Sequence, residues 1–179
     1  MHQTKGMTSD FRLDPDAPHH MVALIRHAKS DWSAETEDRE RPLSKRGRRQ
    51  ATESGQWLRE NFPALDLAIV SPAVRAQDTW DLINAELRWP VEEESLDSAY
   101  TFDGHDLLEI IQDLDDTVSH VAIVGHNPAI EDLITILTDD QARMPTSAVA
   151  IISIRGEWES AGSGNGRLLS AGRPADLVD

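Results

Sequence analysis

The stretch "MVALIRHAKS", residues 21–30, decides the fold class, because a short apolar run ends abruptly at Arg26 and His27. An apolar run of this length between polar segments is typical of a strand that is buried on both faces. The runs "LAIV" and "VAIV", at residues 67–70 and 121–124, have the same character and also end in polar turns. We therefore expect an α/β fold with a largely parallel sheet.

The segments that separate these runs have helical period and start signals. Ser44 is expected to cap the first helix, and Ser71, followed by Pro72, the second. A later helix is expected to begin in the same way at Asn127 and Pro128. The apolar positions expected on the buried helical faces are Ala51, Gly55, Leu58 and Phe62 in the first helix, and Leu107, Leu108, Ile111 and Leu114 in a helix that follows Asp103.

The chain of 179 residues has the length and composition of one globular domain. Hydrophobic residues make up 39% of it, and no apolar run approaches the roughly 20 residues that span a bilayer. Since the N-terminus lacks the apolar centre of a secretory signal, we expect a cytoplasmic protein with a flexible leader over 1–20, one domain over 21–172 and a tail over 173–179. Strands are expected at 21–26, 66–70, 119–124, 148–154 and, more weakly, 166–170.

The net charge and the absence of cysteine exclude several classes of function. A formal net charge of -15 argues against nucleic-acid or membrane partners, whose binding rests on clustered Lys and Arg. The chain has no cysteine, which removes disulfides, thiolate nucleophiles and cysteine metal sites. Any anion site must therefore be a local cationic island, and the oligomeric state stays open.

Three strands are followed by side chains suited to phosphate. Arg26 and His27 follow the first strand, Arg75 lies in "SPAVRA" after the second, and His126 lies in "VGHNP" after the third. Ligands of open α/β sheets lie beyond the carboxyl ends of the strands, so these groups are expected to converge. Arginine matches phosphate geometrically, and a neutral histidine is a nucleophile. Ser33 is a weaker candidate for a phosphate contact.

The motifs "RHAKS", "SPAVRAQDT" and "VGHNP", in that order, resemble those of the histidine phosphatase superfamily. The segments "RPLSKRG" and "MPTSAVA" are similar to its small bacterial phosphohistidine phosphatase branch of SixA type. The resemblance covers roughly residues 21–155. It implies a three-layer α/β/α sandwich with a mostly parallel central sheet, as in phosphoglycerate mutase.

The resemblance also assigns roles to the four side chains. It implies that His27 becomes phosphorylated, that Arg26 and Arg75 bind the phosphate, and that His126 is the second histidine of the pocket. Water would then hydrolyse the phosphohistidine without a metal or cofactor. The implied substrate is a phosphohistidine-bearing protein or a small phosphorylated compound.

One position departs from the pattern of the family. Many members have a glutamate that protonates an alcohol leaving group, and Ser98 stands where that acid is expected. Glu94, Asp97 or Asp103 could replace it, and the sequence does not choose among them. Imidazole takes up a proton near pH 6.5, so a phosphohistidine substrate depends less on such an acid.

Other interpretations remain open at this stage. The protein could be a small-molecule phosphomonoesterase, a noncatalytic phosphate or phosphoprotein binder, or a metallophosphoesterase with His27, Asp31 and His126 as ligands. The role of the acidic loop 33–42 is open. Further polar residues are expected to be exposed or structural (Lys29, His105), unstructured in the leader (His19, His20), or close to the pocket (Thr146, Ser147).

Overall fold

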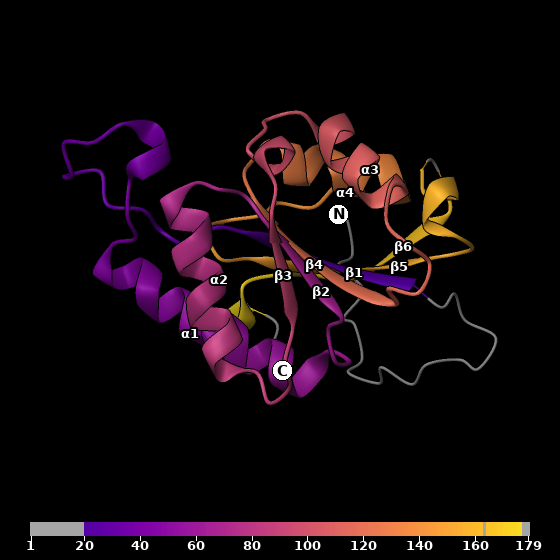
Figure 1. Cartoon of the computed structure of the whole chain (residues 1–179), viewed down its shortest axis with the longest axis horizontal. Helices are drawn as coiled ribbons and strands as arrows, with labels where there is room; N and C mark the ends of the chain where they lie inside the picture. Colours follow the sequence, from indigo (N-terminus) through magenta and orange to yellow (C-terminus); the bar gives the residue numbers. More distant parts are fainter. Residues whose placement is uncertain (1–19, 163, 177–179) are drawn as a thin grey trace, which may run out of the picture.

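A six-stranded mixed sheet runs through the middle of the computed structural model, which describes residues 20–162 and 164–176 (Figure 1). The strands are β1 (His20–Arg26), β2 (Leu67–Val70), β3 (Glu92–Ser95), β4 (His120–Gly125), β5 (Val149–Ile154) and β6 (Gly166–Gly172). Their order is β3-β2-β4-β1-β5-β6, in which β3, β2, β4 and β1 are parallel and β5 pairs antiparallel with both of its neighbours, β1 and β6. The α/β prediction is confirmed, and β5 is the strand that runs opposite to the others.

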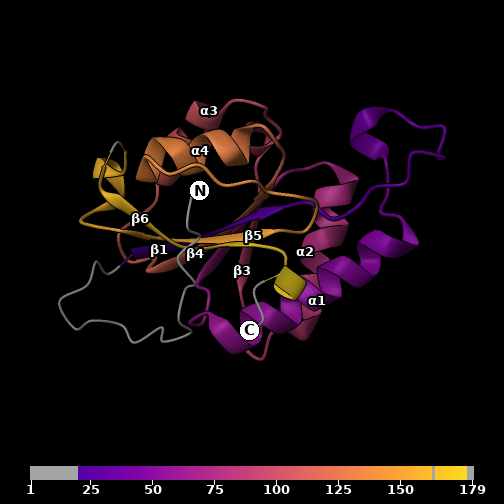
Figure 2. The same ribbon diagram turned by 180° about the vertical axis from the view of Figure 1, so that it is seen from behind.

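Helices cover both faces of this sheet and give three layers. The helices are α1 (Lys45–Asn61), α2 (Val74–Glu86), α3 (Gly104–Gln112) and α4 (Ala129–Thr138), with short 3-10 turns that include η1 (Asp38–Glu40) and η2 (Asp97–Ala99). Figures 1 and 2 show α1 and α2 on one side of the sheet and α3 and α4 on the other. None of the helices in the described part of the chain is both long and apolar enough to traverse a bilayer.

The central strands contribute side chains to both layers. On β1, Val22 and Leu24 belong to the core under α3 and α4, whereas Met21, Ala23 and Ile25 belong to the core under α1 and α2. Since successive side chains of a strand point to opposite faces, both sets must be apolar when both faces are covered. This explains the uninterrupted apolar runs of the sequence.

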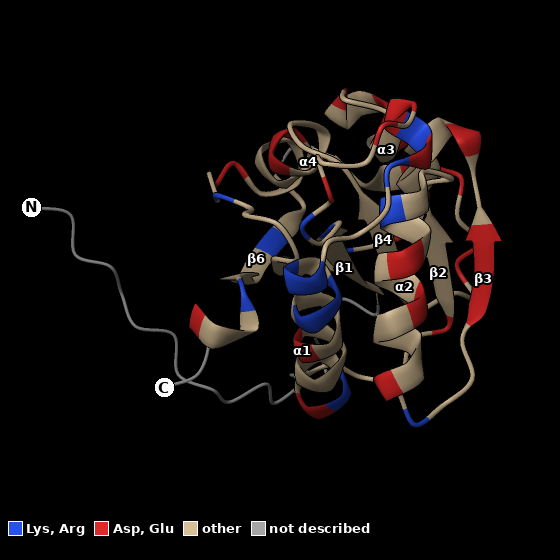
Figure 3. Cartoon of the chain, turned by 90° about the vertical axis from the view of Figure 1, so that its left-hand side faces the viewer, with Lys and Arg blue, Asp and Glu red and all other residues tan. Residues whose placement is uncertain are grey.

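Strand β3 is not among the strands predicted from the sequence. Its residues Glu92, Glu93 and Glu94 are exposed, and the strand pairs with β2 alone at the sheet edge. Figure 3 shows this acidic strand in red. Charged side chains are a known means of protecting an edge strand from further pairing, and they also remove the apolar signal that predicts a strand.

Two of the three predicted serine and asparagine caps are wrong. Ser44 accepts a hydrogen bond from the first turn of α1, as expected. Neither α2 nor α4 has a side-chain cap at its N-terminus. Ser71 Oγ instead contacts His126 Nε2 at 2.7 Å, and Asn127 Nδ2 donates to Glu131 Oε1 at 2.9 Å. Ser71 therefore bonds to the residue that follows β4, whereas Asn127 bonds to a side chain of α4 and, at 2.9 Å, to the carbonyl oxygen of Met144.

The structure places His20 in β1 and not in an unstructured leader. Its side chain is buried, and Nδ1 lies 2.7 Å from the carbonyl oxygen of Gly156. The ring also packs beside Trp158, with centroids 4.5 Å apart. The prediction for His20 is therefore wrong, and residues 1–19, which include His19, lie outside the described part of the chain.

Candidate active site

The four predicted pocket residues meet at the carboxyl ends of β1, β2 and β4. Arg26 is the last residue of β1 and is followed by His27, His126 follows β4 directly, and Arg75 lies in the first turn of α2. Arg75 Nε is 3.4 Å from His27 Nε2, and Arg75 Nη2 is 3.3 Å from His126 Nδ1. The adjacency of the three parallel strands thus brings together residues that are far apart in the sequence.

His27 presents a neutral nitrogen to the pocket. Its Nδ1–H donates to the carbonyl oxygen of Ala28 at 2.8 Å, which leaves the lone pair of Nε2 facing Arg75. Burial, together with the smaller effect of the positive charges of Arg75 and Arg26, lowers the pKa of His27 to about 4. The ring is therefore unprotonated at neutral pH and can act as a nucleophile through Nε2.

His126 is almost completely buried and is fixed from both sides. Its Nε2 contacts Ser71 Oγ at 2.7 Å, while its Nδ1 accepts from Arg75. Burial and then the neighbouring positive charges lower the pKa of His126 to about 3. Its orientation toward His27, with ring centroids 5.2 Å apart, is therefore set by hydrogen bonds to two other elements.

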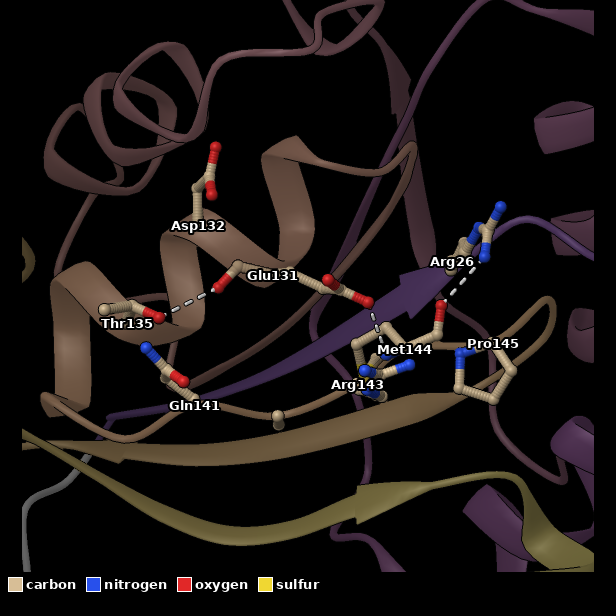
Figure 4. A pocket seen from close by; sticks show the side chains of 9 residues that line it. Arg26, Glu131, Asp132, Thr135, Gln141, Arg143, Met144 and Pro145 are labelled. Carbon is tan, nitrogen blue, oxygen red and sulfur yellow. Dashed lines mark hydrogen bonds between the residues drawn. The ribbon is translucent and has the colours of Figure 1, made fainter.

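Arg26 lies between the pocket and a neighbouring cleft. Its Nη1 donates to the carbonyl oxygen of Met144 at 3.0 Å, and Glu131 of α4 in turn accepts from the Met144 backbone N–H at 2.7 Å. Figure 4 shows these contacts and the cleft between α4 and residues 141–145. Arg26 Nε is buried and has no hydrogen-bond partner within the described ranges. An oxygen of a bound phosphate would satisfy it.

The acidic loop contributes an unexpected member of the site, Asp38 of η1. The main-chain carbonyl oxygen of Asp38 accepts from Arg75 Nη1 at 2.6 Å, and its carboxylate accepts from Arg75 Nη2 at 3.0 Å. The same carboxylate accepts from Tyr100 Oη at 2.6 Å and from Arg41 Nη2. This loop is exposed over most of its length, but through Asp38 it contacts the pocket.

The chemistry of Asp38 is that of a permanent anion. The hydrogen bond from Tyr100 and those from Arg41 and Arg75 hold the pKa of the Asp38 carboxyl well below its usual range. A carboxylate in this state holds no proton to donate, but it orients the guanidinium groups. Asp38, Arg41 and Tyr100 were not predicted as site residues, because no motif or spacing links their loops to the strand ends.

The residues considered as proton donors lie elsewhere. Ser98 is exposed in η2, and Glu94 is exposed on the edge strand. Asp97 pairs with Arg39 at 2.9 Å, and Asp103 accepts from the backbone of α3 at 2.9 Å. Within the described residues, the hydrogen bonds of these side chains do not reach the two histidines or Arg75.

Ser33 and Lys29 are not part of the assembled pocket. The Ser33 hydroxyl donates to Asp31 Oδ1 at 2.6 Å, and the Lys29 side chain is exposed. The Asp31 carboxylate therefore bonds within its own loop. The metallophosphoesterase hypothesis required it to lie beside the histidines. Across residues 20–162 and 164–176, His, Asp and Glu side chains form no group of three that could hold a metal ion.

Thr146 and Ser147 lie beside the end of β1. The Ser147 backbone N–H donates to the carbonyl oxygens of Arg26 and His27, each at 3.1 Å. The Thr146 hydroxyl donates to Gln50 Oε1 at 3.3 Å. Ser147 adopts a φ of 63°, a conformation that is uncommon for a residue with a side chain and that here accompanies its two contacts with the end of β1.

Comparisons with known proteins agree with this arrangement. Residues 22–96 match the family model described as histidine phosphatase superfamily (branch 1). An uncharacterised protein of Mycobacterium tuberculosis is 32% identical over 145 residues, which cover 75% of this chain and 89% of the relative. A phosphohistidine phosphatase SixA homolog of Haemophilus influenzae is 31% identical over 127 residues, which cover 65% of this chain and 76% of the relative.

A solved structure shares both the fold and the size of the domain. The protein histidine phosphatase SixA, complexed with tungstate, superposes with a TM-score of 0.77 and 25% sequence identity. The superposition covers 88% of this chain and 99% of that one. From the strand-end motifs, the fold and these relatives, we conclude that the chain belongs to the histidine phosphatase superfamily and is similar to its SixA branch.

Proposed function

We propose that this protein hydrolyses phosphohistidine on other proteins through a covalent phosphohistidine at His27. The observation that carries the proposal is the ionised state of Asp38. Among the described residues, Asp38 is the only carboxylate that bonds to the pocket arginines. It is already bonded to Arg75, Arg41 and Tyr100 and has no proton to donate. A serine or sugar phosphate has an alkoxide leaving group, which needs a proton donor. An imidazole leaving group takes up a proton from water near neutral pH.

Two relatives support the same substrate class. The Haemophilus influenzae relative is named as a phosphohistidine phosphatase homolog. The SixA structure contains tungstate, a tetrahedral oxyanion like phosphate. We extend both properties to this chain because His27, Arg75 and His126 contact one another at the strand ends.

The proposed reaction has two steps. His27 Nε2 attacks phosphorus, and the bond between phosphorus and the substrate imidazole breaks with its electron pair passing to the leaving nitrogen. Arg26 Nε and the Arg75 guanidinium hold the phosphoryl oxygens, because charge stabilisation and positioning are the main requirements of phosphoryl transfer. Water then attacks phosphorus, the bond to Nε2 breaks, and inorganic phosphate leaves.

The test is transfer of radiolabelled phosphate from a phosphohistidine protein. We expect an acid-labile phosphoenzyme that His27→Ala abolishes and that the matched variant His105→Ala, at an exposed position on α3, leaves intact. We also expect phosphohistidine to be hydrolysed faster than phosphoserine peptides and sugar phosphates. Faster turnover of the phosphate esters would favour a small-molecule phosphomonoesterase, and label that persists in His27→Ala would overturn the mechanism.

A further inference from the structure

Two large apolar side chains are exposed in the described residues, and both belong to loops around the pocket. Trp32 is 70% exposed and Phe102 is 54% exposed. Single exposed apolar residues are common on protein surfaces, so exposure alone does not indicate a function and the position of the residue is needed as well. The two residues differ in this respect, because Trp32 covers the Arg41 guanidinium at 3.7 Å from its ring centroid.

Phe102 continues an aromatic surface that begins at the buried histidine of the pocket. The ring centroids of Phe102 and Tyr100 lie 6.0 Å and 5.4 Å from that of His126, and 6.2 Å from each other. His126 in turn lies 5.2 Å from His27. A row of rings therefore leads from the nucleophile to the solvent.

The backbone on both sides of Phe102 is held in place. Thr101 Oγ1 donates to Asp106 and accepts from the Asp103 backbone N–H at 3.1 Å. The Asp103 carboxylate accepts from the backbone of α3 at 2.9 Å. The Tyr100 hydroxyl is fixed on Asp38 at 2.6 Å. Because these contacts fix the segment, the exposed ring is positioned before any ligand arrives.

We propose that Phe102, supported by Tyr100, packs against the imidazole ring of the substrate phosphohistidine and thereby selects an aromatic leaving group. This inference rests on the proposed function. In an in-line transfer the leaving group lies on the side of phosphorus away from the nucleophile, and His27 is buried whereas Phe102 is exposed. Aromatic pairs favour offset or edge-to-face contacts with centroids about 4.5–7 Å apart.

Two substrates with the same scissile bond separate ring packing from chemistry. Phosphoimidazole and phosphoramidate both contain a phosphorus–nitrogen bond, but only phosphoimidazole has an aromatic leaving group. We expect Phe102→Ala to lower the ratio of kcat/KM for phosphoimidazole to that for phosphoramidate by about 10-fold. Phe102→Tyr, which keeps a ring, should restore the ratio, and Trp32→Ala should leave it at the wild-type value.

The other possible results overturn either this inference alone or the proposed function as well. An equal fall with both substrates in Phe102→Ala would mean a structural role and would overturn the inference, as would a ratio that does not change. The proposed function would survive either result, since wild-type protein would still hydrolyse phosphohistidine. Wild-type protein that fails to hydrolyse phosphohistidine and phosphoimidazole would overturn the proposed function and this inference with it.

Discussion

The floor and the rim of the pocket are built in different ways. The floor consists of Arg26, His27, Arg75 and His126, which follow strands of the sheet, and both histidines and Arg75 are buried. The rim consists of Asp38, Arg41, Tyr100 and Phe102, which lie on connections between strands and helices and are more exposed. Strand ends fix the floor through the sheet, whereas the rim is held by side-chain hydrogen bonds such as those to Asp38.

We therefore link the floor to the reaction chemistry and the rim to the choice of substrate. A charge on the floor acts in a water-poor setting, where electrostatic interactions are strong, whereas a rim charge is partly screened by solvent. Loops on a rigid scaffold are also the usual carriers of specificity. We therefore expect floor variants to lose activity on every substrate and rim variants to lose less.

The largest expected effect comes from comparing two arginines that both bond to Asp38. Arg75→Ala removes a buried guanidinium next to both histidines and should lower kcat/KM for phosphohistidine by about 10³-fold. Arg41→Ala removes a rim guanidinium and should lower it by about 10-fold. Steady-state kinetics of both variants measure the difference, and equal losses would erase the distinction between floor and rim.

The pH dependence of stability distinguishes the floor histidines from Asp38. The folded pKa values of His27 and His126, about 4 and about 3, lie below the ordinary value of 6.5. As the pH falls below 6.5, the unfolded chain therefore binds protons first, and the free energy of unfolding decreases by up to about 1.4 kcal/mol per pH unit for each histidine. His120, whose pKa is also lowered by burial, contributes in the same direction.

Urea denaturation at a series of pH values measures this slope. His126→Gln should reduce the slope between pH 6.5 and 5, and an unchanged slope would contradict the assignment. Asp38 acts in a lower window, because its folded pKa is depressed. Its contribution is present above the ordinary carboxyl pKa of 3.8 and is lost as the pH falls below it, so Asp38→Asn should leave the upper window unchanged.

Two glycines, Gly47 and Gly125, test how closely the floor packs against neighbouring elements. A Cβ added to Gly47 of α1 would lie 2.0 Å from the carbonyl oxygen of Lys29, two residues after His27, so the helix and this turn would have to separate. Gly47→Ala should therefore lower the free energy of unfolding by about 2–3 kcal/mol. In the matched variant Gly125→Ala, the added carbon meets its nearest atoms at 3.8 Å, and a much smaller change is expected. Urea denaturation of both variants gives the comparison, and equal losses would contradict it.

The sequence predicts the floor well because its signals are local. An apolar run gives each strand, and the polar residues that follow it, such as Arg26 and His27, must lie at the strand end. The order of parallel strands then brings the ends together. The same local signals misplaced the roles of Ser71 and Asn127, because a side chain suited to capping can bond elsewhere instead. Ser71 bonds to His126, and Asn127 bonds to the Glu131 side chain and the Met144 carbonyl oxygen.

The rim escapes prediction because its contacts are not local. Asp38 is 62 residues from Tyr100, whose hydroxyl donates to it at 2.6 Å. It lies in a loop rich in carboxylates, a composition that is typical of a solvated segment. Nothing in the sequence separates Asp38 from Glu37 or Glu40 beside it. Only the fold of the loop against α2 selects one carboxylate as the partner of Arg75.

Neutralising Asp38 is expected to have a much smaller effect than removing Arg75. Asp38→Asn keeps an oxygen acceptor of the same shape but removes the charge that Arg75, Arg41 and Tyr100 share. If Asp38 orients Arg75, kcat/KM should fall by about 10-fold, with Asp38→Ala lower still because no acceptor remains. The matched variant is Asp31→Asn in the same loop, where the carboxylate bonds only to Ser33 among the described residues, and it should retain wild-type kinetics. A higher kcat/KM in Asp38→Asn would mean that the carboxylate competes with phosphate for Arg75 and would place Asp38 as an obstacle to substrate rather than a support.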